Sequence, residues 1–137
     1  MVRIAAGTLM IVTGGIHNAF GLLLGFGLIE QPGGARRNLV GEMIYEGVVG
    51  TAEADPLRMT FFWFEYCGAL FVVLGALMLF IERRGQPLPA SLGWMMLTLA
   101  VVGVVFVPAS GLWLLIPQAA LIVRRARSSV VASNDPP

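Results

Sequence analysis

The sequence predicts an all-α fold, a bundle of four transmembrane helices with one short amphipathic helix in the first outer loop. Hydrophobic residues make up 57% of the 137 residues and charged residues only 12%, and the mean hydropathy is +0.81. A soluble domain of this length could not bury so much apolar surface. The apolar residues also gather in four stretches, three of which reach the roughly 20 residues that cross the hydrocarbon core of a bilayer.

The first predicted span covers residues 4–29, and its only strongly polar members, His17 and Asn18, lie near its centre. The apolar part of a secretory signal is about 7–15 residues long and ends at a small-residue cleavage site. This stretch is longer and runs into Glu30, so we expect an uncleaved helix. The second predicted span covers residues 57–81.

The third and fourth predicted spans cover residues 88–107 and 111–123. A Pro-Ala-Ser-Gly turn at residues 108–111 separates them, and three arginines between 124 and 127 end the shorter fourth span. A single long helix over residues 88–123 is the alternative, which the turn disfavours.

The outer loop at residues 30–56 is too long for a simple connection. Five apolar residues recur in it at helical spacing, while Glu42 and Glu46 lie one turn apart on another face. These five residues are Leu39, Val40, Met43, Ile44 and Val48. They predict a short amphipathic helix that either lies on the membrane surface or folds over the mouth of the bundle as a lid.

The distribution of arginine predicts the topology, because short cytoplasmic loops are enriched in basic residues. Six of the nine arginines fall on the side of the two termini and three in the outer loop, so we expect both termini in the cytoplasm. The membrane domain would cover residues 1–126, and residues 127–137, which show no periodicity, would form a disordered cytoplasmic tail. The absence of lysine suits a GC-rich bacterial genome, and we expect the bacterial inner membrane as the location.

The buried polar residues are the candidate functional residues. His17 shares a helix face with small residues such as Gly14 and Gly21, and Glu65 shares one with Gly68, so both should point toward neighbouring helices. Ionisable side chains inside a membrane are costly and often functional. We therefore expect His17 and Glu65 to form an acid/base pair or to bind a polar group of a lipid-soluble molecule. Further candidate ligand-binding residues are Asn18, Thr98, Gln118, Trp63 and Tyr66.

Three functions remain open at this point. The first is the binding of a lipophilic small molecule in an intramembrane polar pocket at His17 and Glu65, with possible acid/base chemistry. The second is a small proton-coupled transporter, and the third is an accessory protein whose polar residues only fix helix packing. Membrane lipid, a lipophilic small molecule and a second copy of the chain are the expected partners.

Several other functions lack support in the sequence. There is no basic stripe of the kind that binds nucleic acid. One histidine and one buried carboxylate fall short of the three or four protein ligands that zinc takes, and His17 alone is weak evidence for haem, so we expect neither a metal nor a cofactor. Cys67 is the only cysteine, which excludes an internal disulfide.

Three short motifs resemble a family of small four-helix bacterial membrane proteins of unknown function. They are Ile-His-Asn-Ala-Phe-Gly at residues 16–21, Phe-Phe-Trp-Phe at residues 61–64 followed by Gly68, and Pro-Ala-Ser-Gly-Leu-Trp-Leu at residues 108–114. The resemblance covers residues 4–125. It implies that His17 belongs to a pattern shared by the family, and it implies no particular activity.

Overall fold

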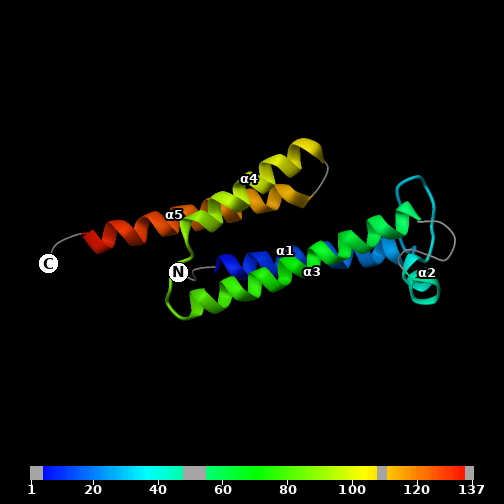
Figure 1. The fold of residues 1–137 in the computed structure, drawn as a ribbon, viewed down its shortest axis with the longest axis horizontal. Helices are drawn as coiled ribbons and strands as arrows, with labels where there is room; N and C mark the ends of the chain where they lie inside the picture. The colour runs from blue at the N-terminus through cyan, green and yellow to red at the C-terminus, as the bar shows by residue number, and fades with distance from the viewer. Residues whose placement is uncertain (1–4, 48–54, 108–110, 135–137) are drawn as a thin grey trace. The chain divides into compact units, whose positions relative to one another are not determined.

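The computed structural model describes residues 5–47, 55–107 and 111–134. Within these ranges the chain forms five α-helices and one short 3₁₀-helix, and it contains no strand (Figure 1). This confirms the predicted all-α fold. The chain divides into two compact units, one formed by residues 13–72 and the other by residues 1–12 with 73–137.

Helix α1 covers Ala6–Gly25 and ends four residues before the predicted end of the first span. Gly27 adopts a φ of 69°, its N–H donates to the carbonyl of Leu24, and the N–H of Leu28 donates to that of Leu23 at 2.9 Å. This is the Schellman arrangement, in which a glycine in the left-handed region stops a helix. An apolar pattern alone does not reveal such a stop, which explains the longer prediction.

Helix α2 covers Leu39–Glu46 and confirms a short helix in the loop after α1. The side chain of Asn38 accepts a hydrogen bond from the N–H of Gly41 at 2.9 Å and caps the helix. The connection before it is held by the buried side chain of Gln31, whose Nε2 donates to the carbonyls of Leu24 and Arg37 at 2.7 and 2.6 Å. Val48, which the amphipathic pattern included, lies outside the described residues.

Helix α3 covers Pro56–Arg83. Asp55 caps its start, because Oδ1 accepts from the N–H groups of Leu57 and Arg58 at 2.9 and 3.4 Å, and proline suits the first helical position. The helix ends in the same way as α1, with Gly85 at a φ of 72°. The second predicted span therefore lies inside a longer helix.

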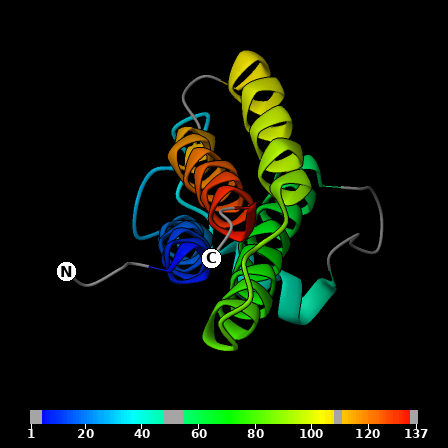
Figure 2. The ribbon, with the colours of Figure 1, turned by 90° about the vertical axis from the view of Figure 1, so that its left-hand side faces the viewer.

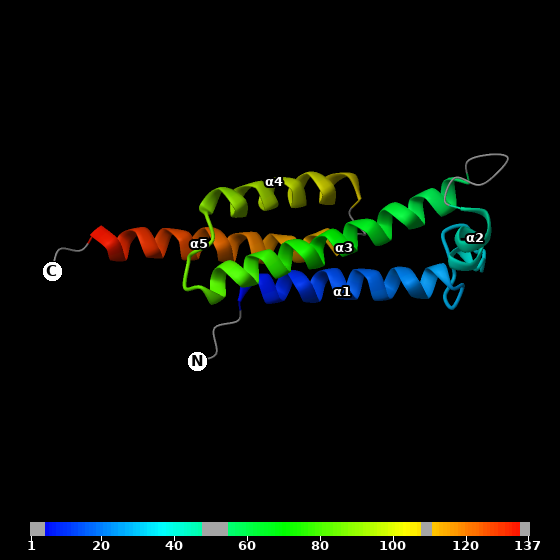
Figure 3. The same cartoon turned by 60° about the horizontal axis from the view of Figure 1, so that its bottom comes forward.

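Helices α1 and α3 pack against each other through glycines, in antiparallel directions (Figure 3). In the unit of residues 13–72, a Cβ built on Gly14 would lie 2.7 Å from the carbonyl oxygen of Gly68 and 2.9 Å from the nitrogen of Val72. In the other unit, a Cβ on Gly75 would lie 2.7 Å from the nitrogen of Ile11. The backbones approach so closely that no side chain fits between them.

Helices α4 and α5 form an antiparallel pair in the second unit (Figures 1 and 2). Helix α4 covers Ala90–Phe106, and a 3₁₀-helix at Gly111–Leu114 leads into α5 at Leu115–Asn134. A Cβ on Gly93 would lie 3.0 Å from the carbonyl oxygen of Ala119, so these backbones also meet closely. The predicted turn at residues 108–110 lies outside the described residues.

The predicted disordered tail is wrong for residues 127–134, because α5 continues to Asn134. The segment after Val123 contains neither glycine nor proline before Pro136, and Arg and Ala are strong helix formers. The buried side chain of Ala126 gives the helix a further contact beyond the apolar span. Loss of apolar character therefore marked the end of the hydrophobic stretch and not the end of the helix.

One carboxylate joins three elements of this second unit. Oε1 of Glu82, near the end of α3, accepts from the N–H of Ala6, and Oε2 accepts from the N–H of Gly7, both at 2.9 Å. Nη1 of Arg125 on α5 lies 3.3 Å from Oε1. A negative charge at a helix N-terminus satisfies otherwise unpaired N–H groups and interacts favourably with the helix dipole. Glu82 thus holds the first turn of α1.

Two of the helices, α1 and α3, are long and apolar enough to cross a membrane, and α4 is apolar but only 17 residues long. Within the most apolar window of each long helix, only 28% and 17% of the residues are buried inside the molecule. Core helices of soluble proteins are mostly buried, so these two helices expose apolar faces that need another cover.

Candidate functional site

The unit of residues 13–72 contains a groove between α1, α2 and α3. Its volume is about 370 Å³. Six apolar side chains and one carboxyl group line it: Leu22, Val40, Met43, Ile44, Phe61, Phe62 and Glu65. Helix α2 contributes three of these side chains, so its apolar face turns toward the groove. Ile44 stays 75% exposed, and the two arrangements that the sequence left open for α2 both stay predictions.

Glu65 is positioned by the absence of a side chain on α1. Its Oε1 occupies the space in which a Cβ on Gly21 would lie. This oxygen is buried and has no hydrogen-bond partner among the described residues. A contact with the Cα–H group of glycine is at most a weak hydrogen bond. Glu65 thus places one carboxyl oxygen against the backbone of α1, where it lacks a strong hydrogen bond.

His17 is bonded to α3, but not to Glu65. Its Nε2 lies 3.0 Å from the carbonyl oxygen of Phe64, and its ring stacks on the ring of Phe64 with centroids 3.7 Å apart. Because a carbonyl only accepts, Nε2 must carry the proton. No hydrogen bond or ion pair joins His17 to Glu65 in the described structure. Phe64 engages both Nε2 and the ring of His17, and the acid/base pair of His17 and Glu65 stays a prediction.

Asn18 of α1 lies against a glycine of α3, just as Glu65 of α3 lies against a glycine of α1. Its Oδ1 occupies the space in which a Cβ on Gly68 would lie, and it is buried without a hydrogen-bond partner in the described ranges. Each helix thus places one polar oxygen against a glycine of the other. Asn18 does not line the groove.

The other candidate residues do not line the groove either. Trp63 and Tyr66 are 54% and 49% exposed, and their rings pack edge to face at 5.8 Å, so both lie on the outer surface of α3. Thr98 is exposed, and its hydroxyl donates to the carbonyl of Trp94 in its own helix at 3.0 Å. Gln118 is buried in α5. Thr98 and Gln118 belong to the other unit, and a polar layer shared by all helices stays a prediction.

Ion pairs hold the two ends of α2 to the start of α3. Arg37 pairs with Glu42, and its Nη2 lies 2.5 Å from Oδ2 of Asp55. The buried side chain of Arg58 pairs with Glu46 at 2.7 Å and with Asp55 at 3.3 Å. The hydrogen bond from Arg37 lowers the pKa of Asp55 to about 2 from its ordinary value of 3.8. The sequence indicated only an acidic loop, because it does not show which charges meet.

We expect Arg37→Gln to release α2 from α3. The substitution removes the link from Glu42 to Asp55, so the amide groups of α2 should exchange with solvent faster in hydrogen-exchange measurements. Arg36→Gln is the matched control, because Arg36 makes only a 3.7 Å contact with Glu30 and both side chains are mostly exposed. Equal exchange in the two variants would contradict a specific role of Arg37.

The ion pair between Arg37 and Asp55 also predicts how the stability of α2 depends on pH. The pKa of Asp55 is lower in the folded chain than in the unfolded one, so its stabilising contribution is complete above pH 3.8 and is lost as the pH falls through about 2. Wild-type α2 should therefore stay protected at pH 4 and lose protection between pH 4 and pH 2.

In the parts of the chain that are described, no three His, Cys, Asp or Glu side chains gather into a set that could hold a metal ion. The candidate site is instead an apolar groove with a single carboxyl group, built on two glycine-packed helices and bordered by a third. These features define an all-helical protein with two helices able to cross a membrane.

The chain belongs to a family of unknown function, DUF6463, whose model matches residues 1–129. This confirms the family of unknown function that the three short motifs indicated. No curated protein and no solved structure matches the chain.

Proposed function

We propose that this chain is an integral membrane protein that binds a lipophilic small molecule in the groove between α1, α2 and α3. The observation that carries the proposal is the composition of the groove, in which six apolar side chains surround one carboxyl group. Small-molecule sites are mostly apolar with few polar groups that fix orientation, and about 370 Å³ lies near the lower end of their usual volumes.

The proposed membrane location is supported by the exposed apolar faces of α1 and α3. Helix α4 has 17 residues, which correspond to a length of about 26 Å, close to the thickness of a hydrocarbon core. Helix α5 would complete four spans, with its arginines at the cytoplasmic surface. The excess of arginine near both termini supports a cytoplasmic location of the two ends in a bacterial inner membrane.

The ligand should carry a hydrogen-bond donor. No basic side chain lines the groove, and Oε1 of Glu65 has no partner in the described structure. A carboxyl group in apolar surroundings is costly unless a donor or a positive charge meets it. The aromatic rings of Phe61 and Phe62 also favour a cation. An alkylamine meets these requirements better than an alcohol, and a fatty acid meets them least.

His17 has a different role in this proposal. Its contacts with Phe64 fix α1 against α3, so His17 and Asn18 serve helix packing and are not part of the ligand site. Acid/base chemistry at His17 finds no supporting contact.

The test compares dodecylamine, dodecanol and dodecanoate at equal mole fraction in maltoside micelles, with thermal unfolding as the measurement. Dodecylamine should raise the wild-type Tm most. Glu65→Gln should weaken amine binding about tenfold, the loss expected for one hydrogen bond to a charged group. Glu30→Gln, at an exposed position outside the groove, should not change it.

A second pair of variants tests the apolar part of the groove. Val40→Trp should fill it and remove the response to all three ligands, whereas Val73→Trp, at an exposed position of α3, should keep the response. A wild-type Tm that none of the three ligands changes would overturn the proposed function.

A further inference from the structure

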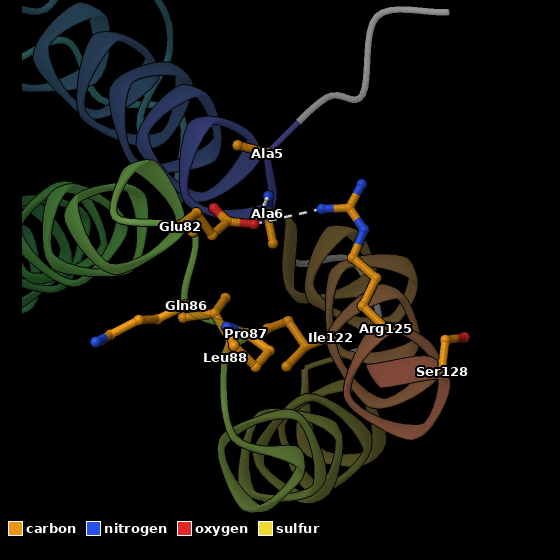
Figure 4. A pocket seen from close by; sticks show the side chains of 10 residues that line it. Ala5, Ala6, Glu82, Gln86, Pro87, Leu88, Ile122, Arg125 and Ser128 are labelled. Atoms are coloured by element: carbon orange, nitrogen blue, oxygen red, sulfur yellow. Dashed lines mark hydrogen bonds and ion pairs between the residues drawn. The ribbon is translucent and has the colours of Figure 1, made fainter. Parts of the chain in front are cut away.

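The other unit, formed by residues 1–12 and 73–137, contains a second cleft. It has a volume of about 600 Å³ and lies between the start of α1, the end of α3, the connection to α4, and α5 (Figure 4). Ala5, Ala6, Glu82, Gly85, Gln86, Pro87, Leu88, Ile122, Arg125 and Ser128 line it. None of these residues lines the groove at Glu65.

The cleft has a polar side and an apolar side. Glu82 and Arg125 are joined at one side, and the apolar side chains of Leu88 and Ile122 lie at the other (Figure 4). Leu88 and Ile122 are 6% and 1% exposed, so they form a closed apolar wall of the cleft. Gln86 and Ser128 add polar groups to the lining. This division suits a molecule with a polar head and an apolar chain.

The charge around the cleft favours an anion. The negative charge of Glu82 already meets the N–H groups of Ala6 and Gly7 and the guanidinium of Arg125. Residues 5–12, 73–107 and 111–134 contain five arginines and one acidic residue. The five are Arg83, Arg84, Arg124, Arg125 and Arg127. An excess of positive charge therefore remains once Glu82 is counted.

Two of these arginines contact aromatic rings, as arginines near the headgroups of a membrane often do. The guanidinium of Arg127 lies 5.9 Å from the ring of Trp94 near the start of α4, and that of Arg84 lies 4.2 Å from the ring of Phe80. Tryptophan and arginine are typical of the boundary between headgroups and acyl chains in membrane proteins. The cleft lies beside the same helix ends.

We propose that this cleft binds the headgroup of an anionic phospholipid from the cytoplasmic leaflet. The phosphate diester contacts Arg125 at the polar side, and an acyl chain lies against the wall formed by Leu88 and Ile122. Basic pockets between helices on the cytoplasmic side are typical binding sites for such lipids. The proposal rests on the membrane location proposed above, but not on the ligand of the groove.

The test measures the Tm of the detergent-solubilised protein with dioleoylphosphatidylglycerol, dioleoylphosphatidylcholine or inorganic phosphate. Phosphatidylglycerol should stabilise the wild type more than phosphatidylcholine, because the choline cation meets an excess of arginine. Inorganic phosphate should have little effect, because it cannot cover the apolar side. An equal effect of inorganic phosphate would overturn the assignment to a lipid.

Two neighbouring arginines provide the matched variants. Arg125→Gln should lower the affinity for phosphatidylglycerol about tenfold, and Arg124→Gln, which removes the same charge outside the cleft, should lower it by a clearly smaller factor. Ser128→Glu adds a negative charge one turn from Arg125, and it should also abolish the lipid effect. Each variant is compared with its own lipid-free Tm, so a change in basal stability does not mimic lost binding.

An equal loss in Arg124→Gln and Arg125→Gln would show binding to the general surface charge and would overturn the proposed site. The dodecylamine response, measured on the same samples, reports on the groove. A lost lipid effect with an intact amine response therefore contradicts this inference alone.

Discussion

Replacing Gly14 with alanine is expected to destabilise the protein by about 3 kcal/mol or more, whereas the same change at Gly15 is expected to be neutral or slightly stabilising. A Cβ at position 14 would lie 2.7 Å from the carbonyl oxygen of Gly68 and 2.9 Å from the nitrogen of Val72. These are backbone atoms of α3, which cannot move aside as a flexible side chain can. The two helices would have to separate.

Gly15 is the matched control, because a Cβ there meets nothing within 4 Å. Alanine at a helix interior position that has room for it reduces the conformational entropy of the unfolded chain and raises helix propensity. Thermal or denaturant unfolding of the two variants in the same detergent measures the difference. Equal stability of the two variants would show that α1 and α3 do not pack through Gly14.

Replacing Glu82 with alanine is expected to cost about 2–3 kcal/mol, the second largest effect. The change removes the acceptors of the Ala6 and Gly7 N–H groups and the partner of Arg125 at once. The side chain of Glu82 is only 16% exposed, so water replaces these contacts poorly. The first turn of α1 should fray, and hydrogen exchange at Ala6 and Gly7 should become faster.

Two comparisons separate the contributions of Glu82. Glu30→Ala removes a carboxylate from an exposed pair and should change stability by less than about 1 kcal/mol. Arg125→Gln leaves the two N–H contacts intact and should cost less than Glu82→Ala. If Glu82→Ala were as stable as Glu30→Ala, the carboxylate would not hold the start of α1.

The helices could be predicted from the sequence because hydrophobic periodicity and length are local properties. Their ends were less predictable. Gly27 ends α1 through a backbone conformation that depends on hydrogen bonds to Leu23 and Leu24, and α5 continues past Val123 through residues that are polar but good helix formers. Apolar character and helical structure end at different residues in both cases.

The candidate site was predictable only in part. Glu65 stood out because a carboxyl group in an apolar stretch is costly, and it does line the groove. Its neighbours Val40 and Met43 could not be assigned, because the sequence does not show where a loop helix packs. The stacking of His17 on Phe64 was missed for the same reason, since it depends on the alignment of two helices.

One signal in the sequence could have given that alignment. Glycine recurs every seven residues at positions 7, 14 and 21 on α1 and at 68 and 75 on α3. A spacing of seven returns to the same side of a helix, so these glycines form one continuous strip on each. Matching the two strips in antiparallel order places Gly14 opposite Val72 and Gly21 opposite Glu65, as the structure has them.

At Gly14 this strip brings the backbone of α1 against the backbone of α3, with no side chain between them that can change rotamer. Within residues 13–72 the two helices should therefore separate only at a high energetic cost, since backbone contacts would have to break. If the groove binds a ligand as proposed, its release should require movement of α2, and the release rate should depend on the ion pairs that Arg37 and Arg58 make with α2.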